Sequence, residues 1–219
     1  MALLFCAITA IIIICMCQKC SAEGTEQTVL MIDPGHGGLD GGAVAADGTP
    51  ESGINLAISQ RLHELCRLFG VGAVMTRTEE TLEYPDALTT IHEKKVWDQK
   101  QRVELINRTP GAVLISIHQN KYPDPRPSGT QVFYGNSPES AALGTLTHEL
   151  LISSLCPENR RVAAPISDKI YLFKNVSCPA VLVECGFLSN SQELSRLKTS
   201  EYQCALALVI FCAYMQYRH

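Results

Sequence analysis

Four polar residues stand where predicted strands end or where a predicted helix begins, and together they could hold and use a metal ion. His36 follows the apolar run Val29–Ile32, Glu51 lies just ahead of an apolar helix, and His118 and Glu184 each end a short apolar run. The carboxyl ends of parallel strands emerge at one edge of a sheet, where ligand crevices form. We therefore expect both histidines and both glutamates to converge there.

Two imidazoles and one carboxylate are the protein ligands of an open catalytic zinc site, whose fourth position holds water. The remaining carboxylate could then act as a general base on that water and deliver the proton to a leaving amine. The pattern alone does not say which of Glu51 and Glu184 binds the metal. Asp33 is predicted, from its closeness in sequence, to orient His36 through the second ring nitrogen.

Each of these residues also has an ordinary structural explanation. The spacing between them matches no local metal signature such as H-E-x-x-H. A histidine or glutamate can simply end a strand, and Glu51 can interact favourably with a helix dipole from the first turn. The metal site therefore remains a hypothesis at this level.

The elements that would position these residues form an alternating α/β pattern, which predicts a mainly parallel central sheet of about six strands flanked by helices on both faces. The predicted strands are Thr28–Asp33, Val71–Arg77, Val113–Ile117, Thr130–Tyr134, Ile170–Phe173 and Ala180–Glu184. The predicted helices are Ile54–Phe69, Lys95–Asn107, Pro138–Leu155 and Glu201–Tyr217, with loops at Tyr122–Ser128 and Glu79–Glu93.

The composition is that of one globular domain behind a targeting segment. The chain has 219 residues, of which 46% are hydrophobic and 18% charged, and its net charge of −4 argues against nucleic acid as a partner. Residues 2–17 are uncharged but span only about 24 Å as a helix, short of a bilayer core of about 30 Å. We therefore predict a signal peptide or short signal anchor over residues 1–22, export across the membrane, and membrane contact through this segment alone.

Six cysteines follow the targeting segment. Cys66, Cys204 and Cys212 lie among apolar residues at helical spacing, which predicts thiols packed in the core. Cys185 stands beside Glu184, and an alternative is that it is the nucleophile of a cysteine hydrolase with His36 or His118 as its base.

Six ordered motifs resemble the zinc-dependent N-acetylmuramoyl-L-alanine amidases of bacteria, and the resemblance covers residues 28–217. The motifs are Val29–Asp40 (VLMIDPGHGGLD), Glu51–Leu56 (ESGINL), Met75–Arg77 (MTR), Arg102–Asn107 (RVELIN), Ser116–Asn120 (SIHQN) and Val183–Asn190 (VECGFLSN). The resemblance implies a twisted, mainly parallel sheet, zinc held by His36, Glu51 and His118, and Glu184 as the catalytic base. It also implies hydrolysis of the amide between N-acetylmuramic acid and the L-alanine of peptidoglycan stem peptides.

A narrower resemblance is to the germination-specific, spore-cortex branch of that family. It is carried by Ser128–Tyr134, by Glu158–Arg161 followed by Ile170–Asn175, and by Tyr202-Gln203. It implies removal of stem peptides so that muramic-δ-lactam can form in the spore cortex. Lys121 and Cys185 depart from the family, where smaller or aliphatic residues are usual.

Several alternatives and secondary assignments accompany this interpretation. The same amidase chemistry could serve vegetative wall turnover or cell separation, and a noncatalytic peptidoglycan-binding module could share the scaffold. We expect Arg77, Arg102, Asn107 and Asn120 to form buried polar networks rather than to act in catalysis. The remaining histidines match no metal motif: His63, His92, His148 and His219.

Overall fold

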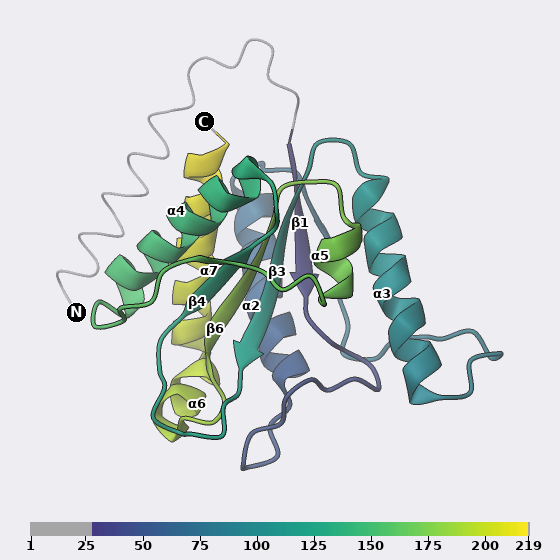
Figure 1. The fold of residues 1–219 in the computed structure, drawn as a ribbon, viewed down its shortest axis with the longest axis horizontal. Helices are drawn as coiled ribbons and strands as arrows, with labels where there is room; N and C mark the ends of the chain where they lie inside the picture. Colours follow the sequence, from purple (N-terminus) through teal and green to yellow (C-terminus); the bar gives the residue numbers. More distant parts are fainter. Residues whose placement is uncertain (1–27, 219) are drawn as a thin grey trace, which may run out of the picture.

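A six-stranded sheet runs through the centre of the molecule (Figure 1). The computed structural model describes residues 28–218, so the predicted targeting segment lies outside the described residues. The strands are β1 (Val29–Pro34), β2 (Ala73–Met75), β3 (Ala112–Asn120), β4 (Gln131–Tyr134), β5 (Ala164–Pro165) and β6 (Ala180–Phe187). Their order is β2-β1-β3-β6-β4-β5, and every neighbouring pair is parallel except β4 with β6.

Helices cover both faces of this sheet, so the predicted fold class is confirmed. They are α2 (Glu51–Leu68), α3 (Ile91–Asn107), α4 (Pro138–Leu155), α5 (Tyr171–Asn175), α6 (Ser191–Leu197) and α7 (Ser200–Tyr217). In Figure 1, α3 and α5 stand to the right of β3, whereas α4 and α7 lie to its left. Among residues 28–218, we find no helix with the length and apolar character needed to span a bilayer.

Alternation along the strands divides the interior into two apolar clusters. Val113, Ile115 and Ile117 of β3 point into the larger cluster, which also holds side chains of α2, α4 and α7. Leu114 of β3 points the other way and packs with Ile106 of α3, and the same cluster includes residues of α5. Successive strand residues face opposite sides of a sheet, so Ser116 and His118 continue the row of Leu114.

Local capping explains where several helices begin. Thr90 and Glu93 form a reciprocal capping box at α3, and this places the helix start four residues before the predicted one at Lys95. Ser137 caps α4 ahead of Pro138, and that helix has its predicted bounds. Asn190 caps α6, a short helix that the sequence pattern did not reveal.

The predicted strand Ile170–Phe173 is wrong, because helix α5 occupies Tyr171–Asn175. A short apolar run does not by itself distinguish a strand from a helix. Here Leu172 is buried in the smaller cluster while Ile170 is 40% exposed. The edge beside β4 is taken instead by β5, whose two residues include a proline that has no N–H to donate.

The cysteines behave partly as predicted. Cys66 and Cys212 are buried, but Cys204 is exposed, so its prediction as a core thiol is wrong. Cys204 lies on the outer side of α7, next to Leu208 and opposite Leu65 and Leu68 of α2. Cys66, Cys156, Cys178, Cys185 and Cys204 of the described region are free thiols.

Candidate metal centre and catalytic edge

The four predicted site residues come from four elements that end or begin at the same edge of the sheet. His36 follows β1, Glu51 is the first residue of α2, His118 lies near the end of β3, and Glu184 lies in β6. His118 and Glu184 are register partners in adjacent parallel strands, so their side chains leave the sheet on the same side. The convergence that the sequence predicted is present.

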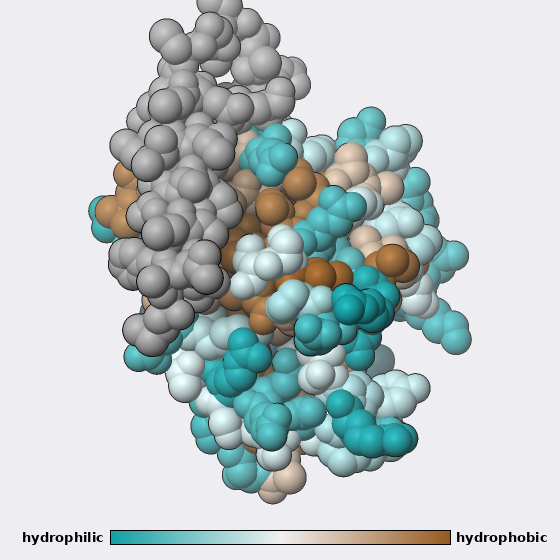
Figure 2. All heavy atoms as spheres, turned by 90° about the vertical axis from the view of Figure 1, so that its left-hand side faces the viewer, coloured by the Kyte–Doolittle hydropathy of each residue, from teal (hydrophilic) through white to brown (hydrophobic). Residues whose placement is uncertain are grey.

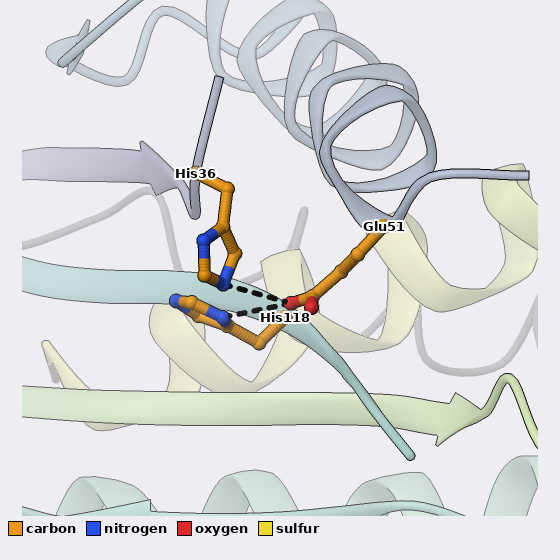
Figure 3. Close-up of side chains that lie close together, drawn as sticks. All are labelled: His36, Glu51 and His118. Carbon is orange, nitrogen blue, oxygen red and sulfur yellow. Dashed lines mark hydrogen bonds and ion pairs between the residues drawn. The ribbon is translucent and has the colours of Figure 1, made fainter. Parts of the chain in front are cut away.

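His36, Glu51 and His118 form a compact cluster (Figure 3). One donor atom from each lies within 4.8 Å of the others. His36 Nε2 is 3.5 Å and His118 Nδ1 is 2.9 Å from Glu51 Oε1, and the two rings meet edge to face with centroids 5.0 Å apart. Two imidazole nitrogens and one carboxylate oxygen at this spacing are a donor set that suits zinc.

Glu51 is held as a carboxylate by its surroundings. It is buried, and its oxygens accept hydrogen bonds from the backbone N–H groups of Ala43 and Gln119 and from the side-chain amide of Asn55. Burial alone would raise its pKa, but the hydrogen bond and charge of His118 outweigh burial and lower the pKa to about 2. Glu51 is therefore ionised at neutral pH.

The charge around the cluster favours a cation. Burial alone would lower the pKa of His118, yet its hydrogen bond to Glu51 and the nearby carboxylates of Glu184 and Asp33 raise that pKa. The pocket of carboxylates thus stabilises positive charge at His118, and it would stabilise a divalent ion at the same place.

Two glycines make room for the cluster. A Cβ at Gly35 would lie 2.2 Å from the His118 ring, and a Cβ at Gly42 would lie 2.6 Å from the His36 ring. Gly42 also has a positive φ of 68°, and His36 is the non-glycine residue with a positive φ, 61°, among the described residues. Backbone strain of this kind persists where the surrounding structure fixes it, often at functional sites.

The predicted role of Asp33 as the partner of His36 is wrong. The second ring nitrogen of His36, Nδ1, lies 3.0 Å from Asp40 Oδ2, and Lys95 pairs with the other oxygen of Asp40 at 3.0 Å. Asp33 instead accepts hydrogen bonds from Ser116 and Arg102. Sequence proximity favoured Asp33, but the turn after β1 brings the more distant aspartate to the ring.

Arg77 and Arg102 form the buried network that was predicted for them. The Arg77 guanidinium donates to the carbonyls of Pro34, Gly35 and Ser52. Arg102 donates to the carbonyls of Pro34 and His36 and pairs with Asp33 at 2.8 Å. The two arginines therefore fix the backbone that carries His36.

The two asparagines grouped with them behave differently. Asn107 is exposed and joins the end of α3 to Asn175 and Ser177, so a buried role is wrong for this residue. Asn120 is half-buried at the end of β3, at the rim of a cavity described below.

Glu184 differs from Glu51 in its environment. Its Oε2 atom is buried and has no hydrogen-bond partner among the described residues. Burial raises the pKa of Glu184 to about 7, with the His118 charge opposing that rise and the Glu51 charge adding to it. A carboxylate with a pKa near 7 is suited to exchanging protons at neutral pH.

Cys185 does not share this site. Its side chain belongs to the larger apolar cluster, on the other face of β6 from Glu184. Burial raises the pKa of the Cys185 thiol far above its usual range. A buried, protonated thiol is a poor nucleophile, so the geometry disfavours the cysteine-hydrolase alternative.

Comparisons with known proteins agree on one family. Residues 30–213 match the family described as N-acetylmuramoyl-L-alanine amidase, Amidase_3. The germination-specific N-acetylmuramoyl-L-alanine amidase of Bacillus subtilis is 35% identical over 190 residues, which cover 86% of this chain and 79% of that protein.

Solved structures show the same likeness. The CwlD amidase of Clostridioides difficile, solved in complex with the GerS lipoprotein, has a TM-score of 0.83 and 34% identity over 87% of this chain and 98% of its own. The catalytic domain of the amidase CwlV from Bacillus (Paenibacillus) polymyxa has a TM-score of 0.71 and 26% identity, covering 87% of this chain and 97% of that one.

Proposed function

Because the chain belongs to the Amidase_3 family of N-acetylmuramoyl-L-alanine amidases, and is thus a peptidoglycan amidase, we propose that it works as a zinc hydrolase in spore cortex maturation. The bond cleaved is the amide between the lactyl group of N-acetylmuramic acid and L-alanine. The product needed for muramic-δ-lactam formation is a muramic acid freed of its stem peptide.

In this proposal zinc is held by His36 through Nε2, by the Glu51 carboxylate and by His118 through Nδ1. The observation that carries the assignment is the clustering of these donor atoms within 4.8 Å, beside a buried carboxyl oxygen of Glu184 that has no hydrogen-bond partner within residues 28–218. When bound, zinc supplies Lewis-acid chemistry that polarises the scissile carbonyl and makes water more acidic.

Glu184 is the general base in this scheme. Its carboxylate accepts a proton from the attacking water and returns that proton to the amine of L-alanine as the C–N bond breaks. Burial, which raises the pKa of Glu184 to about 7, allows the same group to take up and release a proton near neutral pH. Asp40 and the arginines act through His36 and are positioning residues.

The role in the spore cortex rests on the relatives. The B. subtilis relative at 35% identity is named as germination-specific, and the likeness to CwlD supports the same branch. The CwlD amidase was solved in complex with the GerS lipoprotein, which supports a lipoprotein partner for this chain as well. Peptidoglycan lies outside the cytoplasmic membrane, which supports export by the predicted segment at residues 1–22.

Metal analysis and product analysis of the purified full chain test the chemistry together. We expect about one zinc ion per chain and release of stem peptides with a free L-alanine amine, detected by mass spectrometry of digested peptidoglycan. A chelator is expected to abolish release and added zinc to restore it. Stem-peptide release that survives complete removal of metal would refute the zinc assignment.

The biological role needs a separate measurement. Disruption of the gene followed by muropeptide analysis of spore cortex is expected to show loss of muramic-δ-lactam. Normal lactam content together with a defect in vegetative wall turnover or cell separation would favour the alternative role for the same chemistry.

A further inference from the structure

A small cavity begins one strand beyond Glu184. Gln131 of β4 is the register partner of Glu184, so His118, Glu184 and Gln131 leave adjacent strands on the same side of the sheet. The cavity has a volume of about 250 Å³. Its lining residues are Asn120, Tyr122, Pro127, Gln131, Phe133, Arg161 and Phe187. It therefore continues the row of site residues along the sheet edge.

A second, larger cavity of about 940 Å³ adjoins the first, since both are lined by Pro127 and Arg161. Its charged lining residues are four arginines and two glutamates: Arg126, Arg160, Arg161, Arg196, Glu158 and Glu193. Arg160 pairs with Glu158, and Arg126 pairs with Asp124 outside the lining, which leaves Arg161 and Arg196 against the single charge of Glu193. The cavity therefore has an excess of positive charge.

Arg161 stands where the two cavities meet, and its guanidinium is fixed in place. It lies over the Phe187 ring at 4.9 Å, only three residues along β6 from Glu184. Its Nη1 donates to the Asn159 side chain at 3.2 Å and to the Ser128 carbonyl. Arg161 is half-buried, and no carboxylate of residues 28–218 forms an ion pair with it.

The chemistry of the substrate says which part of it fits such a cavity. The N-acetylated sugars are neutral, and the lactyl carboxyl of muramic acid is consumed in the scissile amide. The remaining carboxylates belong to the stem peptide. A fixed guanidinium binds carboxylates through paired N–H groups, so a cationic cavity beside the catalytic edge suits the peptide side of the scissile bond.

We propose that the two adjoining cavities bind the stem peptide and that Arg161 recognises the free α-carboxylate of its second residue, D-glutamate. The inference rests on the proposed function and adds a specificity residue to it. Arg161 contacts neither the metal donors nor Glu184, so its loss acts on peptide binding rather than on bond cleavage.

Two matched substrates test the proposal on the full chain. One is a muramyl tripeptide with a free D-glutamyl α-carboxylate, and the other is the same compound with that group amidated. We expect amidation to raise KM about tenfold to a hundredfold for the unaltered enzyme, with kcat little changed, as for loss of a charge-assisted hydrogen bond. Arg161→Gln should raise KM for the free acid by a similar factor and remove the difference between substrates.

Control variants separate recognition from structural damage. Arg161→Lys keeps the charge but not the planar fork, and it should recover part of the preference for the free acid. Arg67→Gln removes an exposed arginine near the far end of α2 and should leave both KM values unchanged. Thermal denaturation of all variants checks folding.

The outcomes distinguish this inference from the proposed function. If the unaltered enzyme cleaves both substrates with equal KM, or if Arg161→Gln raises both KM values equally, the carboxylate assignment is wrong while the amidase chemistry stands. Calorimetric binding of the free tripeptide supplies a measure independent of cleavage. If neither substrate is cleaved and the tripeptide binds Arg161→Gln as tightly as the unaltered chain, both ideas fail.

Discussion

The two faces of the central sheet differ in how completely helices cover them. The face toward α2, α4 and α7 is apolar through Val113, Ile115 and Ile117 of β3, and Ile115 is fully buried. The face toward α3 and α5 has a smaller apolar cluster, then the ionic pair of Asp33 and Arg102, and finally His118 and Glu184.

This difference indicates that one face mainly stabilises the fold and the other mainly carries the site. Buried apolar area is the main favourable contribution to folding, so the fully covered face stabilises the fold. The other face leaves the sheet edge open to a substrate. Figure 2, which views the side of α4 and α7, shows apolar residues higher up and mainly hydrophilic ones at the lower end, toward which the β3 arrow points in Figure 1. The predictions below test whether stability and chemistry separate in this way.

The largest expected effect is that of His118→Ala on the open face. Removal of one of three donors should abolish zinc binding and reduce stem-peptide release by more than about 10⁴-fold, because both zinc chemistry and its alignment with Glu184 are lost. Metal analysis and the peptide-release assay measure this. His92→Ala, at an exposed position of α3, is the matched control. Retained zinc in the His118 variant would contradict the donor assignment.

Glu184→Gln should separate chemistry from stability most clearly. We expect kcat to fall about 10²- to 10⁴-fold, the usual contribution of a general base, while zinc content stays normal. The free energy of unfolding should be unchanged or higher, because a neutral group replaces a buried carboxyl whose Oε2 has no hydrogen-bond partner in the described part of the chain. Glu201→Gln, an exposed glutamate of α7, is the control. A normal kcat would show that Glu184 is not the base.

Ile115→Ala tests the covered face. This side chain is fully buried in the larger cluster, so its truncation should lower the free energy of unfolding by about 2–5 kcal/mol. Urea denaturation measures the loss. Ile170→Ala, at a position that is 40% exposed, should change stability by less than about 0.5 kcal/mol. Similar losses in the two variants would mean that the covered face is not the main source of stability.

The smallest expected effect is the acid sensitivity of the Asp33–Arg102 pair. Burial alone would raise the pKa of Asp33, but Arg102 and the hydrogen bonds from Ser116 and Thr76 lower it from 3.8 to about 2. A lowered folded-state pKa gives stability that is present above the unfolded value and lost as the pH falls.

Between pH 4 and pH 2 the folded protein should therefore lose about 2 kcal/mol through this group. Urea denaturation across this range measures the slope. Asp33→Asn should be less stable at neutral pH but should have a flatter slope, and exposed Asp86→Asn should follow the unaltered chain. An unchanged slope in Asp33→Asn would exclude this pair as the source.

Much of the fold could be predicted because strand alternation and helix caps are local signals. The bounds of α4 follow from Ser137 and Pro138, and β3 follows from its apolar run. Helix α5 could not be predicted, since what makes it a helix is the contact of Leu172 with the smaller cluster rather than its composition.

The site was also predictable in part: its location could be predicted, but its detailed contacts could not. Convergence of His36, His118 and Glu184 follows from parallel strands alone. The aspartate that contacts His36 could not be predicted in this way. A tight turn with a positive φ at His36 decides which aspartate reaches the ring. The arginine-lined cavities could not be predicted from the sequence either, because residues of α6 and of loops distant in sequence line the larger one together.

The antiparallel pairing of β4 with β6 has a consequence for how this enzyme can diversify. A parallel β4 would require a crossover that leaves the edge where β3 ends, whereas the antiparallel β4 begins at that edge. The connection at residues 121–130 can thus remain beside the open crevice, and it contributes Tyr122 and Pro127 to its wall. Neither apolar cluster contains a residue of this segment, so insertions or substitutions here can reshape the crevice wall without changing the packing of the core.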